Sequence, residues 1–387
     1  MKAEQIYAFA DEVAAEALGT KPGSIKDTSS FAGLQIELEK SADNREAVYN
    51  SIIDKVGKTA IFAREYVRDG RATEVDAMEF GIIYERIRYT FGDSIANPAW
   101  GSEAFDPFNI PNSVTASAMY FKAIATFSQP AVIEDRRLMT AFRNVQSFGA
   151  FVDGIYTTLM NAINFKTDEV QSTAINTAYA GTLQYGTDLQ KRNLLTEYNT
   201  ITNKTLTVAS CRRDEDFLKF CAQEITRVTR KLKGLKTIYN PKGMQNQTTE
   251  ENMIIEVLAD FATDITYNMR SNVYHEELVK MPKYREVEKW QYSGTDDSFE
   301  NNSTISISNT GDTSVVSEGD SVPISVTQSG VIACIRDSAM VVQTIKDFYS
   351  ASEYNKMTRK TNVLYSAELG YLIDMTQNCV VFYIAET

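Results

Sequence analysis

The longest helical pattern in the chain covers residues 145–181 and constrains the fold more than any other segment. Ser147 is expected to cap its start, and Gly181 is expected to end it. A continuous helix here would measure about 50 Å, whereas the average helix has about 11–12 residues. The polar stretch 164–168 is its weak point and predicts a kink or a split. One face repeats apolar residues at helical spacing: Phe148, Phe151, Val152, Ile155, Leu159, Ala162 and Ile163.

Composition indicates a folded, acidic chain. The 387 residues suffice for two or three domain-sized units, and 43% of them are hydrophobic. A formal net charge of −12 argues against a nucleic-acid-binding protein, which needs a basic face. We expect neither a signal peptide nor a membrane span, because no apolar run of about 18 residues occurs. Four cysteines without a CxxC pair indicate buried free thiols in a reducing compartment.

Residue types from which active sites are built are scarce. The single histidine, His275, is expected at a helix end or turn, and histidine chemistry needs imidazole beside other groups. No phosphate-binding glycine loop, nucleophile elbow, zinc-protease motif or calcium loop occurs. The acidic clusters 214–216 and 296–297 fit solvated surface charge, although a carboxylate-based α/β enzyme stays an alternative. We therefore expect no catalytic residue, no cofactor, no metal and a structural role.

The N-terminal segment predicts a short amphipathic helix over residues 4–18. Ile6, Phe9 and Val13 share its apolar face. Because a short helix is marginal alone in water, it needs a partner, either its own chain or a neighbouring subunit. A second short helix is expected over residues 43–57.

A charged ribbon follows. Residues 58–67 read as a strand, Asp69-Gly70 is a strong turn signal, and residues 81–91 are the best return strand. A two-stranded ribbon is barely stable alone, so it is either a solvated arm or lies on another molecule. We expect it to contact a neighbouring subunit through these side chains: Arg64, Glu65, Arg68, Arg71, Glu85 and Arg88.

The remaining chain mixes strand and helix patterns. Helices are expected over 214–234 and from 248 to 265. The basic cluster 227–236 closes the first of these helices, where pairing with the helix dipole explains it more simply than nucleic-acid binding does. Residues 361–375 and 379–385 are expected to close the chain as a hairpin. Further strands are expected at 114–128, 206–210, 330–337 and 340–350, and an exposed ribbon or loop over 293–330 with alternation at 303–309 and 321–327.

This order of elements resembles the major capsid protein of tailed phages, with the fold named after phage Hong Kong ninety-seven. The local match is nearest to small short-tailed phages (podoviruses) and rests on IIDKVG (52–57), QSFGAFVDGIYTTLMNAI (146–163) and IACIRDSAMVV (332–342). The resemblance implies an α+β fold with the following units: an N-terminal arm (1–56), an extended E loop with connector (57–113), a P domain with the long spine helix (114–204), an A domain (205–338), and C-terminal strands returning to the P domain (339–387).

The resemblance also implies a function. Many copies would assemble as pentamers and hexamers into an icosahedral virion head shell that encloses double-stranded DNA without sequence-specific binding. Expected partners are further copies of the chain, a portal protein, and scaffolding or decoration proteins, with assembly in the host cytoplasm and no membrane. An alternative with the same fold is the shell of a bacterial encapsulin-type nanocompartment. A long core helix in an ordinary α/β domain is the simplest reading of residues 145–181 alone.

Overall fold

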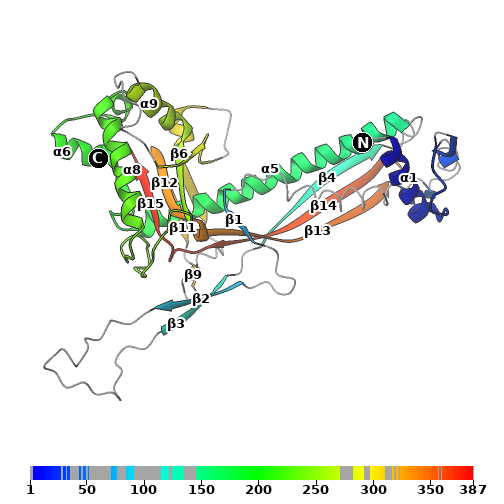
Figure 1. Cartoon of the computed structure of the whole chain (residues 1–387), viewed down its shortest axis with the longest axis horizontal. Helices are drawn as coiled ribbons and strands as arrows, with labels where there is room; N and C mark the ends of the chain where they lie inside the picture. Colours follow the sequence, from blue (N-terminus) through cyan, green and yellow to red (C-terminus); the bar gives the residue numbers. More distant parts are fainter. Residues whose placement is uncertain are drawn as a thin grey trace, which may run out of the picture.

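The computed structural model contains two sheets that one long helix connects. It describes residues 3–27, parts of 29–51, 71–75, 84–90, 115–121, 124–134, 145–270, 282–291, 297–309, 316–317, 320–321, 323–355 and 357–386 except 359. A five-stranded sheet and its helices form a compact unit, and a four-stranded sheet extends away from it (Figure 1). Helix α5 (Val145–Tyr185) runs along the extended sheet into the compact unit, and α1 (Ala3–Leu18) lies at its far end (Figure 1). The predicted mixture of helix and sheet around one long helix is confirmed.

The extended sheet has the strand order β1-β13-β14-β4. Strands β13 (Val341–Asn355) and β14 (Lys360–Ile373) form a long antiparallel hairpin, and β14 also pairs antiparallel with β4 (Ile124–Glu134). The short edge strand β1 (Thr73–Val75) lies parallel to β13. Alternate residues of β14 point to one side and are buried, as a period of two requires: Tyr365, Ala367 and Leu369.

The compact unit is built on a sheet with the order β5-β15-β12-β6-β7. The central strand β12 (Val331–Asp337) is buried along its whole length, as predicted for 330–337. Its neighbours are β15 (Cys379–Tyr383) and β6 (Met253–Leu258), both antiparallel to it. The outer strands β5 (Lys191–Asn193) and β7 (Arg285–Val287) pair in parallel with β15 and β6.

Helices α6 (Leu194–Thr202), α8 (Glu215–Leu232) and α9 (Ala259–Arg270) belong to the compact unit (Figure 1). Helix α8 confirms the prediction for 214–234, because Asp214 caps it by accepting a hydrogen bond from the Phe217 amide at 2.8 Å. Its expected apolar face is buried: Phe217, Leu218, Cys221, Ile225, Val228 and Leu232. The four cysteines are free and buried, as expected.

Smaller elements complete the described chain. Strand β2 (Tyr84–Thr90) pairs antiparallel with β3 (Thr115–Phe121). The two alternating segments within 293–330 pair with each other: β8 (Ile305–Asn309) is antiparallel to β11 (Ile324–Gln328). The others are α7 (Val208–Cys211), α10 (Phe299–Asn302), β9 (Val316–Ser317), β10 (Asp320–Ser321) and a 3-10 turn at Ser338–Met340.

Helix α5 corrects three expectations. It begins at Val145 rather than after a Ser147 cap, and it continues past Gly181 to Tyr185. A Cβ atom at Gly181 would lie 2.9 Å from Cε of Met375, so this glycine permits close packing rather than ending the helix. The helix also runs unbroken through 164–168, where the Thr167 hydroxyl donates to the carbonyl of Ile163 at 2.7 Å.

Two strand and helix predictions in the compact unit are wrong. Residues 206–210 do not form a strand, because Thr207 and Ser210 form a capping box that starts the short helix α7. Residues 253–258 form strand β6 instead of the start of a helix, and only α9 after it is helical. This apolar segment lies between β12 and β7, and burial within a sheet outweighs its helical spacing.

The predicted C-terminal hairpin is also wrong. Strand β14 belongs to the extended sheet and β15 to the five-stranded sheet, so 361–375 and 379–385 do not pair with each other. Instead the chain crosses from one sheet to the other in the turn at 374–378. Strand β4 continues beyond the expected end of 114–128, and β3 precedes it as a separate strand.

Candidate functional site at the junction of the two sheets

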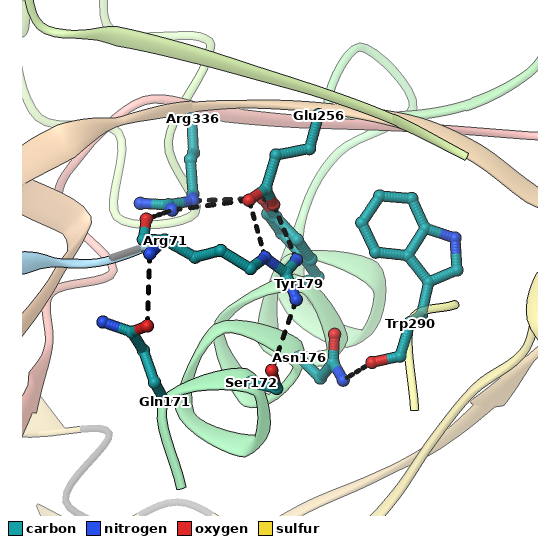
Figure 2. Close-up of polar contacts among 8 residues, drawn as sticks. All are labelled: Arg71, Gln171, Ser172, Asn176, Tyr179, Glu256, Trp290 and Arg336. Atoms are coloured by element: carbon teal, nitrogen blue, oxygen red, sulfur yellow. Dashed lines mark hydrogen bonds and ion pairs between the residues drawn. The ribbon is translucent and has the colours of Figure 1, made fainter. Parts of the chain in front are cut away.

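A buried polar cluster lies where the chain crosses between the two sheets (Figure 2). Four elements contribute to it: Arg71 precedes β1, Tyr179 lies on α5, Glu256 on β6 and Arg336 on β12. The side chains of Glu256 and Arg336 have no solvent exposure, and that of Arg71 is 16% exposed. The cluster therefore joins the long helix, both sheets and the segment directly after the predicted Asp69-Gly70 turn.

Glu256 is the centre of the cluster. Its carboxylate accepts two hydrogen bonds from Arg71, from Nε at 2.9 Å and from Nη2 at 3.0 Å. This paired geometry is the strong form of the arginine–carboxylate interaction. The Tyr179 hydroxyl lies 2.5 Å from Glu256 Oε2 and accepts from Arg336 Nε at 3.1 Å, so its own hydrogen is directed to Glu256. Arg336 also donates through Nη2 to the backbone carbonyl of Arg71.

Electrostatics in the cluster stabilise the ionised form of Glu256. Burial by itself raises the pKa of this carboxyl, but the charges of Arg71 and Arg336 outweigh burial and lower the pKa to about 2. For Tyr179, burial and the neighbouring Glu256 charge raise the pKa well above its usual value. The cluster thus holds two cations and one anion, with a tyrosine that stays protonated at neutral pH.

Amide side chains extend the cluster toward β13 and the compact unit. The Gln171 side chain accepts from the Arg71 backbone amide and donates to Gln343 on β13, both at 3.1 Å. Asn176 donates to the backbone carbonyl of Trp290, whose indole packs edge-on against Tyr179 at 5.8 Å (Figure 2). Because every one of these groups holds another segment in place, the arrangement is suited to fixing the relative positions of α5 and the two sheets.

Arg71 was expected to contact a neighbouring subunit, and the structure corrects this expectation. Its guanidinium is engaged by Glu256, 185 residues away in the sequence, and by the Ser172 hydroxyl at 3.4 Å. Removing this guanidinium would leave the buried carboxylate with Arg336, at 3.8 Å, as its remaining counter-charge among the described residues. Arg71 is therefore part of the chain's own interior.

The expected contact face of the N-terminal helix is partly occupied within the chain. Val13 is 1% exposed and is buried together with its neighbours Ala10 and Ala14. Its side chain is therefore covered within the chain and does not offer the expected contact to another subunit. Phe9 is half-buried. Ile6 lies on α1, and its side chain is outside the described residues.

The other expected contact residues are not placed by the structure. Glu85 and Arg88 lie on strand β2, with side chains outside the described set. Arg64, Glu65, Arg68 and the predicted Asp69-Gly70 turn lie outside the described residues, as does His275.

Sequence reasoning missed Glu256 and Arg336, although a signal for both was present. Each is a lone charge within an apolar segment, MIIEVL for Glu256 and VIACIRD for Arg336. A charge in a buried strand requires an opposite charge nearby, so the two could have been predicted as partners on adjacent strands. Assigning residues 253–258 to a helix removed that possibility.

Other kinds of site receive no support from the described residues. They contain no group of three histidine, cysteine, aspartate or glutamate side chains that could hold a metal ion. In the same part of the chain, no helix has the length and apolar character needed to cross a membrane.

Comparison with solved structures identifies the fold as that of phage capsid proteins. A chain from the capsid structure of Staphylococcus phage Andhra matches with a TM-score of 0.51 and 9% identity, covering 81% of this chain and 83% of that one. A chain from the structure of head fiber and inner core protein gp22 of native bacteriophage P68 also has a TM-score of 0.51, with 10% identity and coverages of 83% and 86%. No curated protein matches the chain in sequence.

The family is shown by sequence. The model of the Phi29-like phage major capsid protein family matches residues 20–383, which is nearly the whole chain. The chain belongs to this family, and its role is that of a head shell protein. The predicted resemblance is confirmed, and the comparisons support neither a nanocompartment shell nor an enzyme.

Proposed function

We propose that copies of this chain assemble as pentamers and hexamers into an icosahedral head shell that encloses double-stranded DNA without sequence-specific binding. The family match over residues 20–383 carries this proposal. In this role the chain performs no catalysis. Its partners are further copies of itself, a portal protein, and scaffolding or decoration proteins, and assembly takes place in the host cytoplasm.

The shape of the chain supports a role in assembly. The extended sheet lies outside the compact unit (Figure 1), and several of its large apolar side chains are exposed. Val132 on β4 is 58% exposed, Leu364 on β14 is 42% exposed, and Met357 in the turn between β13 and β14 is 96% exposed. Exposed apolar groups gathered on one sheet are typical of surfaces that another protein covers.

We propose the same five units with changed boundaries. The N-terminal arm (1–56) and the E loop with connector (57–113) keep their predicted ranges. We shorten the P domain from 114–204 to 114–190 and add 191–204 to the A domain, because β5 pairs with β15 and α6 belongs to the compact unit. We also assign β15 to the A domain, predicted as 205–338, because it pairs with β12, and only β13 and β14 of 339–387 to the P domain.

Electron microscopy of the expressed chain tests the shell. The chain is produced alone and with a scaffolding partner, and closed shells are the expected result. Persistent monomers under all conditions, without rings or shells, would contradict the proposal.

A second test concerns the first part of the predicted ribbon, residues 60–70, which we propose lies on a neighbouring subunit. Residues 73–75 and 84–90 of that ribbon pair with β13 and β3 of the same chain instead. The double variant Arg64→Glu/Arg68→Glu should impair assembly while the unassembled subunit keeps its stability. Arg71→Glu should instead destabilise the subunit itself, because this residue is paired with the buried Glu256. Unchanged assembly of the double variant would refute the contact.

A further inference from the structure

The C-terminal end of α8 and the loop after it carry a basic surface. No acidic residue occurs in 227–242, although the whole chain has a net charge of −12. Pairing with the helix dipole acts only within the last turn, so it does not account for the lysines beyond the helix. The basic surface consists of six side chains: Arg227, Arg230, Lys231, Lys233, Lys236 and Lys242.

Most of this charge is not neutralised by other residues that the structure describes. Lys233 pairs with Glu250 at 2.5 Å, and Arg227 pairs with Glu224. Arg230, Lys231 and Lys242 are exposed and form no ion pair with any residue that the structure describes.

Two exposed apolar side chains lie within the basic surface. Leu235 is 61% exposed and Ile238 is 43% exposed. The phosphate backbone of a nucleic acid offers charge but no apolar area to cover such groups. Protein interfaces combine an apolar centre with a polar rim, so the composition favours an acidic protein surface as the partner.

The same compact unit carries an acidic surface, which consists of Asp260, Asp297 and Glu300 together with the exposed Tyr267. Asp260 at the start of α9 and Asp297 before α10 both accept hydrogen bonds from Asn302, at 3.3 and 3.0 Å. Glu300 on α10 is exposed. Tyr267 is seven residues after Asp260, on the same face of α9, and is 76% exposed. The acidic surface thus also has a large exposed side chain beside its charges.

The two surfaces lie at opposite ends of strand β6. The loop that follows α8 leads into the start of β6, and α9 begins directly after its end. Six residues of strand span about 20 Å. Figure 1 shows α9 at one end of the compact unit and the C-terminal end of α8 toward the other. The surfaces therefore cannot neutralise each other within one chain.

We propose that the basic surface of one subunit docks on the acidic surface of a second copy of the chain. Two different surfaces on every copy make a head-to-tail contact, and such a contact closes into a ring when the rotation between copies permits it. The inference rests on the proposed self-assembly and identifies the surfaces through which compact units meet.

Cysteine cross-linking tests the contact directly. The variant Lys231→Cys/Glu300→Cys carries one new thiol on each surface, and the four native cysteines are buried. With a short bismaleimide, this variant should give a ladder of covalent multimers. Each single variant should give at least about tenfold less product, because only one surface then carries a thiol. No ladder, or dimers from a single variant, would overturn the proposal.

Exchanging the charges separates this contact from DNA binding. Arg230→Glu/Lys231→Glu should lower the yield of shells about tenfold, and adding Asp297→Lys/Glu300→Lys in the same chain should restore most of it. Lys21→Glu/Lys26→Glu, which changes the net charge equally at exposed positions outside the compact unit, should assemble normally. Equal loss in that control, or normal shells that only fail to retain DNA, would overturn the inference.

The two experiments also separate this inference from the shell itself. A cross-linked ladder without closed shells would refute the proposed shell and leave the docking intact. Closed shells of the wild-type chain without a ladder would refute the docking and leave the shell intact.

Discussion

Replacing Glu256 by glutamine tests whether charge holds the junction of the two sheets together. The carboxylate accepts two hydrogen bonds from Arg71 and one from Tyr179, and its side chain has no solvent exposure. Glutamine keeps the size of the side chain but removes the anion, so two buried arginine cations lose their counter-charge. Removing one partner of a buried ion pair lowers the free energy of unfolding by about 3–5 kcal/mol.

The lowered pKa of Glu256 leads to a similar loss in the free energy of unfolding. The carboxyl has a pKa of about 2 in the folded chain and 4.5 as the ordinary value. This difference corresponds to about 3 kcal/mol of stability at neutral pH. We therefore expect Glu256→Gln to lose about 3–5 kcal/mol, a large part of the stability of a typical domain.

Urea unfolding of the unassembled subunit measures this loss. In a Trp100→Phe background, fluorescence comes from Trp290, which is buried against Tyr179 and reports on the junction. Glu250→Gln is the matched control, because Glu250 is 83% exposed and a solvent-exposed ion pair such as that with Lys233 contributes little to stability. A loss below about 1 kcal/mol for Glu256→Gln would refute the reasoning.

A double-mutant cycle then isolates the pair itself. Arg71→Met should cost less, about 1–3 kcal/mol, because Glu256 keeps the Tyr179 hydroxyl and Arg336 at 3.8 Å. The combined variant should lose less than the sum of the two single losses, by about 1–3 kcal/mol. Additive losses would mean that the two side chains do not stabilise the fold through each other.

Three further predictions follow from the same structure. Since the pKa of Glu256 is lowered to about 2, its contribution is complete above about pH 4.5 and is lost as pH falls toward 2; acid unfolding of Glu256→Gln should lack this component. Gly330→Ala should lower the free energy of unfolding by more than about 3 kcal/mol in thermal unfolding, because φ is +75° and a Cβ would lie 2.0 Å from the Ile384 carbonyl oxygen. The control Gly243→Ala should lower it by about 1–2 kcal/mol, because φ is +64° but the space around a Cβ is open. Burial raises the pKa of Cys211 and Cys379 to about 12, so thiol reagents should modify the folded subunit far more slowly than the urea-unfolded chain; rapid modification in the native state would contradict this.

Much of the local structure was predictable because it depends on neighbouring residues. The helix over 215–232 follows from apolar spacing and a capping aspartate at its start. The strand over 331–337 follows from an uninterrupted apolar segment. Each of these two signals is contained within a short stretch of neighbouring residues, so it can be read from the sequence without knowledge of the fold.

The errors concern segments whose state depends on distant partners. Residues 253–258 have a spacing that suits a helix, and they form a strand because β12 and β7 lie on either side. Gly181 appears as a helix stop, but its role depends on Met375, which only folding brings close. The C-terminal strands look like one hairpin, yet each pairs with strands from a different part of the chain.

The sequence by itself determined the long helix at the centre of the chain, the α+β class and the family to which the chain belongs. Only the tertiary structure decided how that helix is fastened to both sheets. Arg71 reads as one charge among many in an exposed ribbon, while Glu256 and Arg336 read as isolated charges in apolar strands. Their pairing spans 185 residues between Arg71 and Glu256. An ion pair over such a separation has no local pattern, because its geometry exists only after β6, β12 and α5 have packed.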